Sequence, residues 1–179
     1  MKNLFIYFII TALLTSCFVL NEPSIEVKEL NNSNFNAING TYNSKIDTFI
    51  PNTLADLLII NYQVKYGKFI YNDGLKCSLE MINKSTMKVK IYRNNILEFA
   101  TQIKGKVKDN FFYMESQKYK GKSIGLFLNL PEKKKTRIAI LHDSSLAVDS
   151  KTRFRSRYFL IPMYYEDEEF NHITFNRIK

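Results

Sequence analysis

The sequence contains no tryptophan, only two cysteines and only two histidines, and these shortages limit the chemistry that it can support. Cys17 and Cys77 are too few for a disulfide framework, and we expect Cys77 to be a buried thiol on the apolar face of a strand. No Gly-x-Ser-x-Gly, Cys-x-x-Cys, His-Glu-x-x-His or phosphate-loop motif occurs. His142 precedes Asp143, but adjacent residues of a strand point to opposite faces, which argues against an acid–base pair. The sequence therefore favours a non-catalytic protein.

Acidic residues are outnumbered by basic ones, 17 to 26, which gives the chain a formal net charge of +9. This balance favours anionic partners such as lipid headgroups or acidic glycans, with solubility alone as the alternative explanation. The candidates for an anionic-partner surface form two basic clusters: Lys133, Lys134 and Lys135, and Arg153, Arg155 and Arg157. The alternatives are a solvated turn for the first cluster and the outward face of a strand for the second.

The acidic run Glu166–Glu169 could gather a hard cation such as calcium. It lacks the alternating ligand pattern of a calcium-binding loop, however. We interpret it as a solvated acidic turn and expect no metal site.

The N-terminal residues have the three parts of a secretory signal: Lys2, the apolar run Leu4–Ile10, and small residues before Cys17. The ending Leu14–Cys17 (Leu-Thr-Ser-Cys) resembles the lipobox of bacterial lipoproteins. This resemblance implies cleavage before Cys17, a diacylglycerol on the Cys17 sulfur and a further acyl chain on its amine. An uncleaved membrane anchor is the alternative, because Leu4–Leu20 approaches the ~20 apolar residues that span a bilayer.

The lipobox resemblance sets the expected organisation of the chain. Residues 1–16 would be the signal peptide, residues 17–37 a lipidated cysteine with a flexible tether, and residues 38–179 the folded domain. Two or more acyl chains hold a protein durably on a membrane. Phe18 follows the cysteine, in place of the aspartate that retains some lipoproteins in the inner membrane. In a Gram-negative host this favours the outer membrane, and the absence of an acidic run after the cysteine, with Glu22 alone, favours its periplasmic face. For an exported lipoprotein we expect no nucleic-acid partner, and no cofactor besides the covalent lipid.

From Tyr66 onward, apolar and polar residues alternate with a period of two, which is typical of half-buried antiparallel strands. Asn94-Asn95 and Asp109-Asn110 supply tight turns between them. Before the strands, Thr53 and Asp56 have the spacing of a capping box at the start of a short helix. We predict an all-β antiparallel meander of about eight to ten strands with one short helix, closing into a barrel because open edges are hazardous. A sandwich is the alternative.

The segment Asn39-Gly40-Thr41-Tyr42 opens the predicted first strand. With the lipobox, the tether, the capped helix and the meander, it resembles the lipocalin-like lipoproteins of Bacteroidota. Lipocalins place a tryptophan two residues after the first-strand glycine, and Tyr42 occupies that position here. The chain departs from the family because it lacks tryptophan, has an early helix, and has no predicted helix after its last strand. The resemblance implies a lipocalin-like barrel but no particular ligand.

Two functions are consistent with these patterns. The first is binding of a small apolar or amphipathic ligand in the mouth of the barrel. The candidate cavity residues point inward from the predicted strands: Leu79, Met81, Met87, Val89, Phe99 and Ile103. The second is a solid barrel that serves as a protein–protein interaction module of the cell envelope through its basic outer face. Both stay open, because a barrel of about eight strands can be filled by its own side chains or can hold one small ligand.

Overall fold

The computed structural model describes residues 18–44, 53–60, 62, 74–119, 127–158 and 161–178. The predicted signal peptide, the lipobox Leu14–Cys17 and the start of the predicted strand region after Tyr66 lie outside the described residues. The side chains of residues 127–130, 156–158 and 161–164 are likewise outside them, so Arg157 is placed by its backbone alone.

Within the described residues, ten antiparallel strands form one sheet, accompanied by a short α-helix and a 3-10 turn, which confirms the predicted all-β fold. The helical elements are η1 (Phe35–Ile38) and α2 (Leu54–Leu58). The strands are β1 (Gly40–Asn43), β2 (Leu75–Asn83), β3 (Thr86–Arg93), β4 (Ile96–Lys108), β5 (Phe111–Met114), β6 (Gln117–Lys118), β7 (Phe127–Ile140), β8 (Leu146–Tyr158), β9 (Ile161–Phe175) and β10 (Arg177–Ile178). Their order in the sheet is β10-β1-β2-β3-β4-β5-β7-β8-β9, and β6 pairs with β7.

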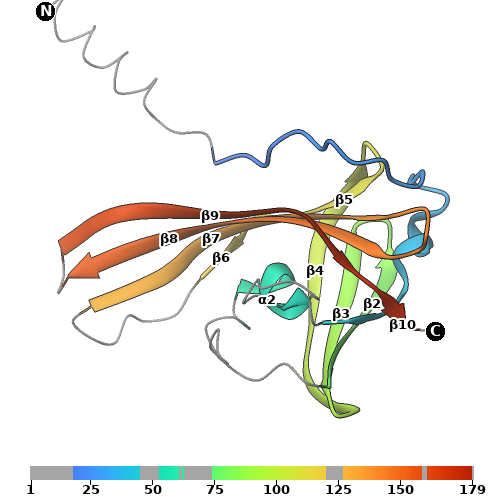
Figure 1. Cartoon of the computed structure of the whole chain (residues 1–179), viewed down its shortest axis with the longest axis horizontal. Helices are drawn as coiled ribbons and strands as arrows, with labels where there is room; N and C mark the ends of the chain where they lie inside the picture. Colours follow the sequence, from blue (N-terminus) through green and yellow to red (C-terminus); the bar gives the residue numbers. More distant parts are fainter. Residues whose placement is uncertain are drawn as a thin grey trace, which may run out of the picture.

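The sheet curls strongly into a half-barrel, so that strands β2–β4 run across the direction in which β7–β9 run (Figure 1). Strand β4 makes the corner, because its residues 96–104 pair with β3 and Gly105–Lys108 pair with β5. A Cβ atom on Gly105 would lie 2.4 Å from the Tyr113 carbonyl oxygen, so only glycine allows this close approach.

The C-terminal segment connects the two ends of the sheet. Phe175 pairs with Leu146 of β8, and two residues later Arg177 pairs with Tyr42 of β1. The Arg177 guanidinium lies 5.8 Å from the centre of the buried Tyr42 ring. The predicted barrel is nevertheless not fully closed: β7, β8 and β9 have 13 to 15 residues and extend beyond the four-residue β1 (Figure 1).

The hydrophobic core fills the concave side of the sheet around α2 (Figure 1). Strands β2 and β3 bury alternate residues, as the period of two predicted, and all five residues of α2 are buried. Cys77 is completely buried, and this burial raises the pKa of its thiol. Tyr42 is also buried: its hydroxyl donates a 2.8 Å hydrogen bond to the Ile38 carbonyl, and burial raises its pKa to about 12.

The predicted capping box begins α2. Thr53 Oγ1 accepts a 3.2 Å hydrogen bond from the Asp56 amide, and the Thr53 amide donates a 2.9 Å hydrogen bond to Asp56 Oδ2. Each of the two buried side chains, Thr53 and Asp56, thus accepts a hydrogen bond from the backbone amide of the other residue. The start of the helix is therefore set by residues close together in the sequence.

The other end of α2 is satisfied by the sheet. The last carbonyls of a helix have no partner within it, and here they lie in the core. Thr136 of β7 and Ser150 of β8 donate hydrogen bonds of 2.9 and 3.2 Å to the Leu57 carbonyl. Gln117 Nε2 of β6 donates a 2.6 Å bond to the Leu58 carbonyl. Three neighbouring strands thus hold one end of the helix.

Lys134 is another side chain that donates to a carbonyl of α2, and its position corrects the prediction that it lies on the surface. It was a candidate for the anionic-partner surface, but its side chain is only 1% exposed. Its Nζ donates to the Asp56 carbonyl of α2. The alternation of β7 turns Lys134 inward while Lys133 and Lys135 point outward. The run of three lysines is therefore not one surface cluster.

The shared carbonyl of Leu57 generates a test by a double-mutant cycle. Because Thr136 and Ser150 each donate to it, Thr136→Val or Ser150→Ala alone leaves one side-chain donor in place. The double variant removes both donors from a buried acceptor, which costs about 1–3 kcal/mol. We expect its loss of unfolding free energy, measured in urea, to exceed the sum of the single losses by roughly 1 kcal/mol. Thr174→Val, at an exposed position of β9, is the control, and simple additivity would contradict the shared role.

Candidate functional site: the basic sheet face and the strap across it

The six candidate cavity residues lie in the packed core. Leu79, Met81, Met87, Val89 and Ile103 are between 0% and 7% exposed and belong to the same cluster as the helix residues. Phe99 is partly buried against this cluster, and the Tyr62 ring packs edge-on against it at 5.9 Å. These side chains and the apolar residues of α2 form one buried cluster, which supports a solid interior.

Basic residues gather on the opposite, outer face of β7 and β8. Lys133 pairs with Arg153 in the register of the two strands, and Lys135 pairs with Lys151. Like charges directly opposite each other destabilise a sheet, so this arrangement needs compensation from neighbouring groups. The sequence predicted Lys133, Lys135 and Arg153 as surface cations, and the fold brings these three together.

Strand β9 supplies compensating carboxylates. Arg153 Nε lies 2.7 Å from Asp167 Oδ1, and Lys151 Nζ lies 3.1 Å from Glu169 Oε2. The hydrogen bond from Arg153 lowers the pKa of Asp167, so this carboxylate stays charged, and the pair stays formed, to a lower pH than an unpaired aspartate would. The prediction that Glu166–Glu169 form a solvated turn was wrong: they lie within β9, paired with basic β8.

Arg155, the next outward residue of β8, extends the same face. Its guanidinium forms an ion pair with Glu132. It also donates a 2.8 Å hydrogen bond to the Tyr165 hydroxyl and lies 5.2 Å from the centre of that ring. The Tyr165 residue is itself 53% exposed. Charged and aromatic groups are therefore interleaved on this face.

Phe18 lies in the middle of the basic residues. Its ring is surrounded by four cationic groups at 4.8 to 5.9 Å from the ring centre, and the residue is only 6% exposed. The four residues are Lys133, Lys135, Lys151 and Arg153. Each such contact with a ring face is attractive by about 0.5–2 kcal/mol, depending on desolvation. We call this arrangement the Phe18 clamp.

Residues 19–34, between Phe18 and η1, form a strap across the sheet. This corrects the prediction that residues 17–37 include a flexible tether, for the part of that range that the structure describes. The strap, blue in Figure 1, runs along the outer side of the sheet. Asn21 Nδ2 donates a 2.7 Å hydrogen bond to Glu169, and the Lys28 amide donates a 2.8 Å bond to the Ile140 carbonyl. Polar, turn-prone residues therefore lie against the domain, because the sheet offers them partners.

A buried ion pair lies beneath the strap. Arg137 and Asp149, paired across β7 and β8, are 2.7 Å apart and nearly inaccessible to solvent. Arg137 also donates a 2.6 Å hydrogen bond to the Asn21 carbonyl of the strap. The backbone amide of His172 donates a 2.6 Å bond to Asp149 from a bulge in β9, with a positive φ of 57°.

Ser24, His172 and Asp149 lie in the order of a catalytic triad, but the geometry does not match one. Ser24 Oγ is 2.9 Å from His172 Nε2, and His172 Nδ1 is 3.1 Å from Asp149 Oδ1. The second distance is short, yet Nδ1 is not aligned for a hydrogen bond. Asp149 is already engaged by Arg137. We interpret the group as a fastening of the strap. No local pattern could have indicated this group, because Ser24 and His172 are 148 positions apart.

Comparison of the chain with protein-family models, curated proteins and solved structures found no match.

Within the described part of the chain, no three potential metal-binding side chains lie together. Over the same residues, no helix is long and apolar enough to cross a membrane. His142 is exposed in the turn after β7, and its neighbour Asp143 bonds to Ser145 instead.

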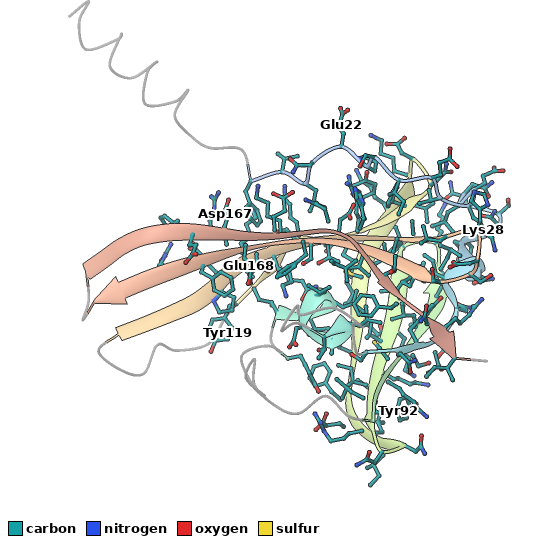
Figure 2. The ribbon with its side chains drawn as sticks, viewed as in Figure 1. Glu22, Lys28, Tyr92, Tyr119, Asp167 and Glu168 are labelled. Carbon is teal, nitrogen blue, oxygen red and sulfur yellow. The ribbon has the colours of Figure 1, made fainter. Side chains whose placement is uncertain are left out.

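A pocket of about 450 Å³ lies between the strap and the sheet. Strap and sheet residues both line it: Val19, Leu20, Asn21, Glu22, Pro23, Asp109, Tyr113, Lys135 and Arg137. Glu22 points away from the sheet (Figure 2). The Arg137 guanidinium lies 5.1 Å from the centre of the Phe111 ring and 5.8 Å from the centre of the Tyr113 ring. Arg137 and Asn21, which line the pocket, are also joined by the hydrogen bond that attaches the strap to the sheet.

The Phe18 clamp generates a test of strap attachment. Phe18→Ala removes the buried ring and its four cationic contacts, at a cost of about 2 kcal/mol or more to docking of the strap. We expect hydrogen exchange of the strap amides to accelerate by roughly 30-fold, with core strands unchanged. Val19→Ala, at the neighbouring 53% exposed residue, should leave exchange as in the unaltered chain. Equal exchange in the two variants would contradict the clamp.

Proposed function

We propose that this chain is a lipid-anchored, non-catalytic protein of the bacterial cell envelope that acts as an interaction module through its basic outer face. The anchor is the covalent lipid on Cys17, and the location is the outer membrane facing the periplasm. The observation that carries the proposal is the Phe18 clamp, because it fastens the residue that follows Cys17 to the basic face.

The packed interior supports an outward-facing function over ligand binding in a barrel mouth. The candidate cavity residues belong to or pack against the same buried cluster as the apolar residues of α2, so helix and strands fill the described interior together. The outer face, in contrast, combines charged groups, the exposed Tyr165 ring and the strap. Of these groups, tyrosine and arginine are the residue types that are enriched in surfaces that bind other proteins.

The buried groups also support a non-catalytic role. Cys77 is the one free thiol among the described residues, and it is sealed in the core with a raised pKa, far from the state of a nucleophile. His172 is bound to the strap and to Asp149 in a geometry that suits attachment.

The test is lipid labelling of the two cysteines. Cells that produce the chain are fed an alkyne analogue of palmitate, and the protein is isolated and its intact mass is measured. We expect the unaltered chain to carry label and to lack residues 1–16, and Cys17→Ser to lose both the label and the cleavage. Cys77→Ala is the matched control and should be labelled normally, because its thiol is buried. Label that persists in Cys17→Ser would refute the anchor.

A further inference from the structure

Because of the Phe18 clamp, no flexible segment separates the proposed anchor from the domain. Successive Cα atoms are about 3.8 Å apart. An anchor on the residue before Phe18 is therefore attached only one such step from the residue that is held on the basic face. A free tether of some 20 residues would instead allow a typical separation of about 25 Å from the anchor. The burial of Phe18 therefore determines which side of the domain meets the lipid.

The face beside the anchor has the charge that an anionic membrane surface attracts. Five cationic side chains lie there against three carboxylates. The cations are Lys133, Lys135, Lys151, Arg153 and Arg155, and the carboxylates are Glu132, Asp167 and Glu169. Glu22 of the strap, which lines the same pocket as Lys135 and points away from the sheet (Figure 2), is a fourth carboxylate, so five positive charges face four negative ones and an excess of one remains beside the clamp. Basic residues next to a membrane anchor are attracted to anionic headgroups.

Exposed apolar groups accompany this charge. Val19, beside the clamp, and Tyr165, stacked on Arg155, are each 53% exposed. Tyrosine is enriched at the boundary between lipid and water, where its ring meets apolar groups and its hydroxyl stays hydrated. Cations interleaved with an aromatic ring and an aliphatic side chain match the headgroup region of a bilayer.

We propose that the Phe18 clamp seats the domain directly on the bilayer, with the outer face of β7, β8 and β9 against anionic lipid headgroups. The inference rests on the lipidation of Cys17 proposed above. A bilayer is favoured over a protein partner at this face because the covalent lipid brings the headgroups to it. The hairpin between β3 and β4, marked by Tyr92, then points away from the membrane, since it lies opposite Asp167 (Figure 2).

The orientation can be measured with spin labels on the mature lipidated protein, reconstituted into vesicles of phosphatidylcholine and phosphatidylglycerol in equal parts. The label is attached to Tyr165→Cys on the basic face or to Ile96→Cys on the distant hairpin, where Ile96 is 73% exposed. Cys77 does not compete for the label, because it is buried. A nickel-chelating lipid in the vesicles relaxes only labels close to the headgroups.

We expect the label at position 165 to relax several-fold faster than the label at position 96. Addition of Phe18→Ala should bring the two rates close together, and the control Ile82→Ala, at a 48% exposed position of β2, should not. Equal relaxation at both positions in a protein that carries the lipid would overturn the seating while leaving the anchor intact. Faster relaxation at 165 that is unchanged in vesicles of phosphatidylcholine alone would overturn the role of anionic headgroups. An intact mass without lipid would refute the proposed function itself, and the seating with it.

Discussion

The buried end of α2 is the constraint on which the rest of the structure depends. A helix of five residues leaves most of its carbonyls without an internal partner, and in an apolar core water cannot supply one. The sheet has to provide the donors, and it does so with Gln117, Lys134, Thr136 and Ser150. These polar positions fix β6, β7 and β8 relative to the helix. They also explain why charged and hydroxyl residues point into the concave side of an otherwise apolar sheet.

The same strands position the outer face. Because side chains alternate across a strand, the register that turns Lys134 and Thr136 towards α2 turns Lys133, Lys135 and Arg137 outward. A shift of one residue would exchange the two sets and lose both the helix donors and the Phe18 clamp. The interior therefore acts as the support of the domain. The outer face collects the groups that meet the strap and, in our account, the membrane.

Local patterns in the sequence were sufficient for the strands and for the start of the helix. The period of two placed β2 and β3, and the spacing of Thr53 and Asp56 gave the capping box. Long-range partners were not readable in this way. The lysine run suggested a surface cluster, since nothing nearby shows that Lys134 meets a carbonyl 78 positions away. The acidic run and the strap were misjudged for the same reason: their partners lie on β8 and β9.

The most direct test of this account is whether the Phe18 ring lies among the four cationic side chains. Protons held over an aromatic face shift upfield, so NMR spectra of the mature protein in detergent micelles report the clamp. The account predicts upfield-shifted side-chain protons for Lys133 and Arg153, with through-space contacts to the Phe18 ring, all lost in Phe18→Leu. Ordinary shifts in the unaltered protein, with no contact to the ring, would contradict the clamp and the membrane seating that depends on it.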